Sequence, residues 1–505
     1  MAKSAALMQL LIPLLSLLTF SRITAAQAPS KIYGVNLGSW LVLEPWMLPN
    51  EWQSMGGQSC SDCSTCIGSE FALAAAFPND VDQRFATHWS TWFTQNDVNQ
   101  LQSLGINTVR IPLGYWIVEP LVHRSTEHYP RGGIKFLTSG LDMLRKAGIR
   151  AILDHHALPG VQVAGQAFTG HCTNNVQFYT SSNYNRALTW TAVMTFLTQL
   201  HPNYQSVFSI EAANEPIMNA AQTPGYGTFQ KNFVKTVRAM ECLIGVKVSG
   251  CSIPGTPTAS NLGARLKTAA QTNPSGWFSS TIVKALNNSL PMLQFVENEI
   301  GWVPDFSAGS QRSPITTKLV LYLSSFMDVL WQYNNPPNPS AAAIGSQGYD
   351  HHLYYRLVSV LVSALSDPLT LATFSRGSFG GVAPSDPTDY LKNVCNRNDV
   401  QQDNSLKDSP MWYGEWALST QFSATDAFLK QWADAQKLAY SAGAGWIFWS
   451  FKIEAGNPLE RQWSYVEGVN LGYLTKDPSQ YNDPNVCVPY RTSTPKRRHA
   501  YRRDH

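Results

Sequence analysis

Two short motifs each place a glutamate at the end of an apolar run, and the two glutamates lie two hundred residues apart. Glu215 stands in an Asn-Glu-Pro sequence after the run 207–210, and Glu415 stands in a Gly-Glu-Trp sequence after the run 411–413. Because Pro216 cannot donate a hydrogen bond to a strand ladder, it predicts the end of a strand, with Glu215 at the carboxyl edge of a sheet. Two carboxyl groups at such an edge meet the requirement for cleaving a glycosidic bond: one protonates the leaving oxygen and the other attacks the sugar carbon.

Other polar side chains lie at the ends of the runs between these motifs. An arginine within an apolar run is costly to bury unless a carboxylate pairs with its guanidinium group. Paired with Glu415, Arg110 would lower the pKa of that carboxyl and keep a nucleophile ionised, and a hydroxyl from Tyr354 would act in the same direction. Glu215 needs the opposite shift, since a general acid must hold its proton.

The remaining candidates are suited to binding a sugar. Asn214 can hydrogen-bond the hydroxyl next to the reacting carbon, and His156 and His352 can hold further hydroxyls. The alternative for both histidines is an interior position with satisfied hydrogen bonds. Trp449 would form an aromatic floor for the sugar, whereas Trp446 is interpreted as a core residue.

Strand-like runs alternate with helical patterns along most of the chain. Amphipathic segments at 97–104 and 137–147 each end at a glycine and precede a β-branched run, which is typical of alternating αβ units. Eight runs are expected to be strands. They are residues 31–37, 106–112, 149–154, 206–210, 326–331, 348–353, 410–413 and 445–449. The pattern predicts an α/β fold, a closed (β/α)₈ barrel in a single catalytic domain with long loop insertions.

The composition favours an uncharged ligand. The 505 residues carry a formal net charge of +3, and 11% are aromatic, so nothing indicates a nucleic-acid partner. Residues 1–26 are typical of a secretory signal peptide, with an uncleaved anchor as the weaker reading, and no other window predicts a membrane span. The catalytic domain is expected over 27–490. The basic tail 491–505 is expected to be disordered, with adhesion to an anionic surface as the alternative.

Eight cysteines in a chain predicted to be secreted indicate disulfide bonds. A metal site at the clustered cysteines is the other reading, but a closed zinc site needs four ligands. An Asn-x-Ser sequence makes Asn287 a candidate glycosylation site on a surface loop. The segment 356–376 fits the pattern poorly and is read as an insertion or a gene-model artefact. The cysteines are Cys60, Cys63, Cys66, Cys172, Cys242, Cys251, Cys395 and Cys487.

The set of motifs resembles glycoside hydrolase family 5, and within it the fungal exo-β-1,3-glucanases. The resemblance runs in order through segments 34–45, 107–116, 154–162, 214–216, 350–354, 414–416 and 445–454. It implies a retaining hydrolase without metal or cofactor, with Glu215 as acid/base and Glu415 as nucleophile. Glu44 is similar to a carboxylate that binds the terminal sugar in exo-acting members. The family's supporting residues match Arg110, His156, Asn214, His352, Tyr354 and Trp449.

We therefore expect a secreted extracellular or cell-wall enzyme, monomeric, that hydrolyses β-glucan with retention, most simply as an exo-β-1,3-glucanase. The first rival is the same chemistry on a β-1,6-glucan, a β-1,4 chain or another β-glucoside. A rival of another class is a wall-glucan-binding protein without turnover, which would require the loss of a catalytic carboxylate.

Overall fold

Eight parallel strands form a closed barrel in the computed structural model, and neighbouring strands follow chain order until β8 pairs with β1. The structure describes residues 28–217, 219–306, 325–327, 348–355, 386–406 and 409–491. The (β/α)₈ prediction is confirmed. The strands are β1 (Ile32–Asn36), β2 (Thr108–Gly114), β3 (Arg150–Ala157), β4 (Val207–Glu211), β5 (Ser325–Met327), β6 (Gly348–Leu353), β7 (Met411–Trp416) and β8 (Gly445–Phe448).

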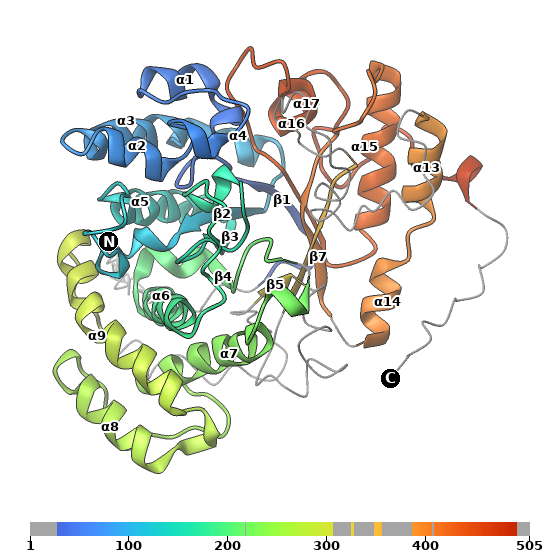
Figure 1. Ribbon diagram of the computed structural model, residues 1–505. Helices are drawn as coiled ribbons and strands as arrows, with labels where there is room; N and C mark the ends of the chain where they lie inside the picture. The colour runs from blue at the N-terminus through green and yellow to red at the C-terminus, as the bar shows by residue number, and fades with distance from the viewer. Residues whose placement is uncertain are drawn as a thin grey trace, which may run out of the picture.

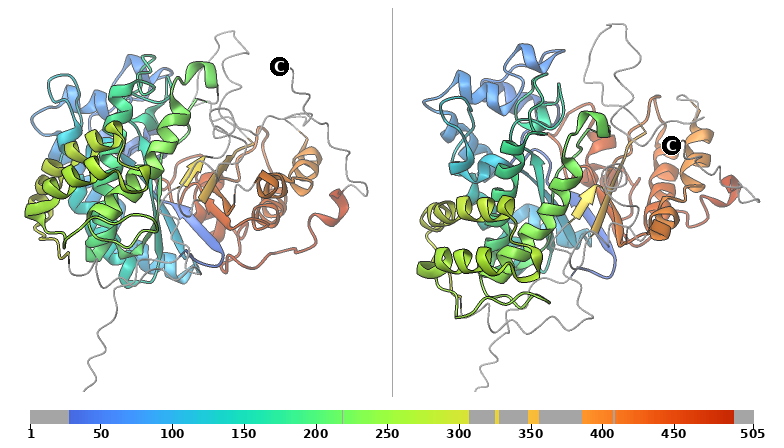
Figure 2. Two further views of the ribbon diagram at one scale, coloured as in Figure 1. Left: turned by 90° about the horizontal axis from the view of Figure 1, so that it is seen from below. Right: turned by 60° about the horizontal axis from the view of Figure 1, so that its bottom comes forward.

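Helices surround this barrel. In both Figure 1 and Figure 2, α8 and α9 lie on one side of the strands, and α13, α14 and α15 lie on the other. The described helices are α1 (Pro49–Ser54), α2 (Glu70–Ala76), α3 (Val81–Trp92), α4 (Gln95–Ser103), α5 (Gly133–Lys146), α6 (Ser181–Leu200), α7 (Tyr226–Leu243), α8 (Leu262–Thr272), α9 (Ser280–Ile300), α13 (Pro387–Cys395), α14 (Asp399–Leu406), α15 (Asp426–Tyr440), α16 (Glu460–Trp463) and α17 (Tyr465–Asn470).

Glycines separate the helices from the strands that follow them, as the sequence predicts. Gly105 follows α4 with φ 66°, and Gly148 follows α5 with φ 72°. A left-handed residue stops a helix and turns the chain toward the next strand, and glycine adopts it without a Cβ clash. The chain therefore enters β2 and β3 directly.

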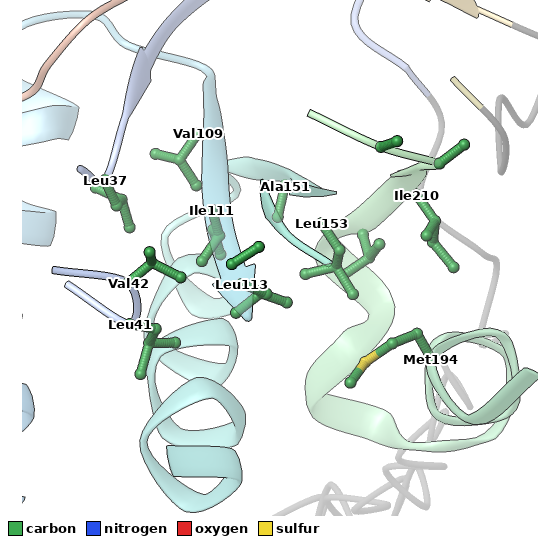
Figure 3. Packing of buried hydrophobic residues seen from close by; sticks show 14 of the residues in the cluster. Leu37, Leu41, Val42, Val109, Ile111, Leu113, Ala151, Leu153, Met194 and Ile210 are labelled. Atoms are coloured by element: carbon green, nitrogen blue, oxygen red, sulfur yellow. The ribbon is translucent and has the colours of Figure 1, made fainter. Parts of the chain in front are cut away.

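The two faces of strand β2 have different roles. Val109, Ile111 and Leu113 pack with apolar side chains of β3 and α6 (Figure 3). Since successive residues of a strand point to opposite faces, Arg110 projects into the barrel. A separate apolar cluster fills the amino-terminal part of the barrel interior, leaving the carboxyl end for polar groups. Its buried members are Ile32, Ile152, Phe208, Trp412 and Ile447.

At the two glutamate motifs, the ends of the strands differ from the sequence prediction. Strand β4 stops at Glu211, so Pro216 is not the residue that ends it. Glu215 has φ 36°, which no strand residue adopts, and it lies in the loop beyond. Strand β7 continues to Trp416, so Glu415 lies within a strand. The described part of β5 is Ser325–Met327, and the predicted continuation to residue 331 lies outside the described residues.

Four disulfides pair all eight cysteines: Cys60 with Cys66, Cys63 with Cys172, Cys242 with Cys251, and Cys395 with Cys487. The disulfide prediction is confirmed. The three clustered cysteines are all oxidised, so they offer no thiolate ligands for a metal.

The candidate glycosylation site is exposed but lies in helix α9, so the prediction of a surface loop is wrong. Apolar residues before and after Asn287 continue the helical period, and this outweighs the weak helix preference of the two adjacent asparagines.

Several predicted segments lie outside the described residues: 1–26, 356–376 and the tail from residue 492 onward. Across the described ranges, none of the helices is both long and apolar enough to cross a membrane.

Candidate active site

Arg110 is the centre of the polar groups inside the barrel. Its side chain is fully buried, and each guanidinium nitrogen has an acceptor. Nη1 donates to Glu415 Oε1 at 2.8 Å, Nε donates to Glu211 Oε2 at 2.8 Å, and Nη2 donates to Asn214 Oδ1 at 2.8 Å. Nη1 also donates to Asn36 Oδ1 at 3.1 Å. A buried guanidinium group with this many partners holds the ends of β1, β4 and β7 in a fixed arrangement.

Besides Arg110, the Glu415 carboxylate has partners from β6 and from the residue that follows it. The hydroxyl of Tyr354 donates to Oε2 at 2.7 Å, and His352 Nδ1 lies 3.3 Å from the same oxygen. Burial raises the pKa of Glu415, while His352 and Arg110 act in the lowering direction. The sequence therefore predicted the Arg110 contact and its effect correctly but not the net direction, because burial is larger than the effect of the nearby cation.

Glu215 reaches the same histidine from the opposite side. His352 Nδ1 lies 2.9 Å from Glu215 Oε1, and the Glu215 side chain keeps 15% of its surface exposed. One carboxyl oxygen each of Glu215 and Glu415, together with His352, lie within 4.8 Å of one another. The two glutamates that are two hundred residues apart in the sequence thus face each other at the carboxyl end of the barrel.

His352 connects these carboxyl groups electrostatically. Burial lowers its pKa, but Glu415, Asp350 and Glu215 together outweigh burial and raise the pKa of His352 well above its usual value. These carboxyl neighbours therefore favour the protonated form of the imidazole. A cation between two carboxyl groups reduces the repulsion that their closeness would otherwise cause.

His156 and Trp449 form a wall of the same site. Their rings are stacked with centroids 5.6 Å apart and an angle of 8° between the planes. His156 Nδ1 lies 2.6 Å from Asp154 Oδ2, so Nδ1–H donates to the carboxylate and Nε2 is left for another partner. Phe168 contacts the edge of the His156 ring. The structure therefore brings both predicted residues to the site.

Glu44 lies on the loop after β1 and belongs to the same electrostatic environment. Trp46 Nε1 donates to Glu44 Oε2 at 2.8 Å. Burial raises the pKa of Glu44 to about 7, with His156 opposing the shift and Glu415 and Glu215 adding to it. All nine predicted site residues thus lie at one end of the barrel.

The sequence reasoning did not assign a role to three further carboxyl groups around Arg110. Asp154 lies 3.1 Å from Arg110 Nη2, and Asp350 lies 3.6 Å from Nε. Glu211 and Asp350 are also close enough to His352 to hold a cation, but Arg110 already supplies the positive charge there. Asp154 ends a predicted strand, Glu211 directly follows one and Asp350 interrupts one, and a charged residue at such a position was the available signal.

Gln162 and Tyr179 were also missed as site residues. Gln162 Nε2 donates to the carbonyls of His156 at 2.7 Å and Asn214 at 3.2 Å. Tyr179 contacts the backbone on the other side of Glu215. Both lie in the loop after β3, whose path cannot be read from residue pattern.

A (β/α)₈ barrel with two facing glutamates, a buried arginine and a tryptophan at the carboxyl ends of its strands defines a glycoside hydrolase. The family model Cellulase (glycosyl hydrolase family 5) matches residues 76–285. Over this range the chain is similar to glycosyl hydrolase family 5.

Curated relatives match over different lengths. Glucan endo-1,6-beta-glucosidase B of Emericella nidulans is 29% identical over 475 residues, which cover 91% of this chain and 89% of the relative. Probable glucan 1,3-beta-glucosidase A of Aspergillus niger is 34% identical over 187 residues, covering 37% of this chain and 41% of the relative. The rutinosidase crystal structure from Aspergillus niger has a TM-score of 0.53 at 18% identity and covers 90% of this chain and 98% of that one. This last similarity concerns the fold alone.

Proposed function

We propose that this protein is a retaining β-glucan hydrolase in which Glu215 is the acid/base and Glu415 the nucleophile. The observation that supports this proposal is the approach of their carboxyl oxygens to within 4.8 Å. Retaining sites hold the two carboxyl groups about 5–5.5 Å apart, whereas inverting sites need roughly 6.5–9.5 Å to admit a water molecule.

In the first step, Glu415 attacks the anomeric carbon while Glu215 protonates the departing oxygen, which gives a glycosyl-enzyme. Arg110 and Tyr354 orient Glu415 through their hydrogen bonds. In the second step, Glu215 takes a proton from water while the water oxygen attacks the anomeric carbon. The bond between that carbon and the Glu415 carboxyl breaks, which releases the sugar and restores the free carboxylate.

Asn214 has a separate part in this scheme. Its amide oxygen accepts from Arg110, which directs the amide NH₂ group away from the guanidinium group. That group is then available to the sugar hydroxyl next to the reacting carbon, an interaction that strengthens as positive charge develops on the ring.

For the linkage, we favour β-1,6-glucan cleaved at internal bonds. The support is the extent of the similarity, because the endo-1,6-glucosidase of Emericella nidulans aligns with nine-tenths of the chain. The second candidate is the exo-β-1,3-glucanase expected from the sequence. It is favoured by the higher identity of the shorter 1,3-glucosidase match and by Glu44, which lies beside Trp46 at the rim of the site.

Product analysis on pustulan, laminarin and carboxymethylcellulose separates these activities. We expect gentio-oligosaccharides of mixed length early in the digestion of pustulan. Glucose as the sole early product from laminarin, with pustulan untouched, would support the second candidate instead. Cleavage of carboxymethylcellulose alone would contradict both.

The catalytic roles are tested by Glu415→Gln, which keeps the shape of the side chain but removes the nucleophile. We expect kcat to fall by at least about 10³-fold while glucan binding is retained. Glu299→Gln, at a surface ion pair with Lys135, is the matched control and should keep full activity. A Glu415→Gln protein that still turns over glucan would contradict the assignment. Weaker glucan binding with an unchanged kcat would indicate that Glu415 binds the substrate and is not the nucleophile.

We also propose that the enzyme is secreted and acts outside the cell or in the wall as a monomer, with its catalytic domain over 27–490. Four disulfides support an oxidising compartment. Size-exclusion chromatography with light scattering, on protein recovered from the culture medium, tests both parts of this proposal.

A further inference from the structure

The segment that carries Glu215 has an unfavourable backbone conformation. Glu215 itself has φ 36°, in the left-handed region that side chains with a Cβ rarely adopt, at a cost of about 1–3 kcal/mol. Such a conformation persists only where the surroundings hold it. The neighbouring loop after β3 provides that support.

Two side chains of this loop hold the backbone on both sides of Glu215. On one side, Gln162 Nε2 donates to the Asn214 carbonyl at 3.2 Å. On the other, the Tyr179 hydroxyl accepts from the Ile217 N–H at 2.7 Å. The same hydroxyl donates to the Gln162 carbonyl at 3.0 Å. The contacts therefore form one connected clamp rather than two separate hydrogen bonds.

The clamp is buried and is joined to the histidine wall. Gln162 is fully buried and Tyr179 is 8% exposed. Gln162 Nε2 also donates to the carbonyl of His156 at 2.7 Å, and the Tyr179 ring packs against Phe178 and Tyr226. A displacement of either side chain would therefore move the Glu215 segment relative to His156.

We propose that Tyr179 and Gln162 are positioning residues that hold the Glu215 carboxyl in the geometry needed for proton transfer. This inference rests on the proposed function, in which Glu215 is the acid/base. A misplacement of about 1 Å can cost about 10²-fold in rate. The loss should fall on the proton transfer, because Glu415 is held by Arg110 and Tyr354. Neither of these residues is a hydrogen-bond partner of Tyr179 or Gln162, and the clamp reaches Arg110 only through Asn214.

The test compares two substrates that differ in their need for an acid. An oligosaccharide leaving group must be protonated as it departs, whereas 2,4-dinitrophenolate leaves without protonation. We expect Tyr179→Phe to lower kcat/KM for the natural-linkage oligosaccharide by about 10–100-fold. For the 2,4-dinitrophenyl glycoside of the same sugar, we expect kcat/KM to stay within about threefold of wild type. This parameter reports the steps up to and including formation of the glycosyl-enzyme, and with this leaving group those steps need no acid.

Tyr204→Phe is the matched control. Its hydroxyl is also buried and hydrogen-bonds Thr138 Oγ1 at 3.2 Å, but it lies before the amino-terminal end of β4, away from the site. We expect both of its rate constants to remain at the wild-type level. Gln162→Met, which removes the donor at similar length, should repeat the leaving-group-dependent loss and serves if Tyr179→Phe folds poorly.

The outcomes separate this inference from the function on which it rests. Equal losses on both substrates, or no loss beyond that of Tyr204→Phe, would overturn the positioning role while leaving the hydrolase proposal intact. A wild-type protein that cleaves neither substrate would overturn both.

Discussion

Three donors surround the buried Glu415 carboxylate. Tyr354, His352 and Arg110 all favour the ionised form, whereas burial favours the neutral form and raises the pKa overall. In the proposed mechanism Glu415 is the nucleophile and must be ionised to attack, so the balance between these effects is expected to set the acidic limb of the rate profile.

Removal of the Tyr354 hydroxyl shifts this balance. In Tyr354→Phe, the Glu415 carboxylate loses a 2.7 Å hydrogen bond, so its pKa rises further. We expect the acidic limb of kcat/KM to move to higher pH and the maximum rate to fall by about 10–100-fold.

The control for this change is the neighbouring Tyr355→Phe, whose hydroxyl contacts Asn393 instead of a site residue. Profiles of kcat/KM against pH for the three proteins are the measurement. A limb that stays in place in Tyr354→Phe would show that this hydroxyl does not control the ionisation of Glu415.

At the scale of single residues, the sequence predicts which side chains contact each other but not the net direction of the pKa shift that those contacts and burial produce. Arg110 and Glu415 were expected to pair because an arginine within an apolar run is costly to bury without a carboxylate partner. The direction of the Glu415 pKa shift depends on burial, which only the folded structure defines. Gln162 and Tyr179 could not be predicted, since they act through the backbone of another loop.

At the scale of elements, the disulfides differ in the length of chain that they close. The Cys63–Cys172 bond joins the loop after α1 to the loop after β3 across 109 residues, whereas the Cys242–Cys251 bond spans 9. In the chain-entropy model, the longer loop gives a stabilisation of about 4–5 kcal/mol and the shorter about 2–3 kcal/mol.

We therefore expect the double variant Cys63→Ser with Cys172→Ser to lose more unfolding free energy than Cys242→Ser with Cys251→Ser. Urea or thermal unfolding of the two variants beside wild type provides the measurement. The opposite order would mean that native contacts, rather than loop closure, determine what each bond contributes.

The eight strands were predictable as elements because buried parallel strands are continuous apolar runs between helix stops. Their ends were less predictable. Tertiary pairing extends β7 through Glu415, opposite His352 of β6, and pairing between strands is not visible in local sequence. The loop position of Glu215 has the same cause, since β4 leaves its ladder at Glu211.

At the scale of the whole molecule, Glu70 makes stability depend on pH. Its carboxyl is fully buried and accepts from the Leu43 N–H at 2.7 Å. Burial raises its pKa from 4.5 to about 8, with the Leu43 hydrogen bond opposing the shift. A raised folded-state pKa means that the contribution is fully present below pH 4.5 and is lost as pH rises toward 8.

Glu70→Gln keeps the acceptor for Leu43 but cannot ionise. We expect it to be more stable than wild type at pH 8, by roughly a few kcal/mol, and nearly equal to wild type at pH 4. Chemical unfolding at both pH values measures the difference. A stability gap that is the same at both pH values would contradict a titration of this group.

The outer surface offers one further test, at Asn287 on α9. This residue is exposed, and its sequon serine donates to the Leu286 carbonyl at 2.7 Å. We expect protein secreted from a eukaryotic host to carry a glycan there. Wild type should then lose mass on deglycosylation, and Asn287→Gln should have about the mass of deglycosylated wild type without any treatment. Identical masses before and after deglycosylation would contradict this expectation.

The pairing of β8 with β1 joins residues near the two ends of the described chain, from Ile32 with Gly445 to Val35 with Phe448. The proposed reacting groups come from strands or loops along this entire length, and Trp449 follows the last strand. An amino-terminal fragment that ends before β7 therefore contains Glu215 but not Glu415. In such a fragment β1 has no β8 to pair with, so one edge of the sheet is open. Catalytic competence thus arises late, only when the final strand has been synthesised and has docked on the first.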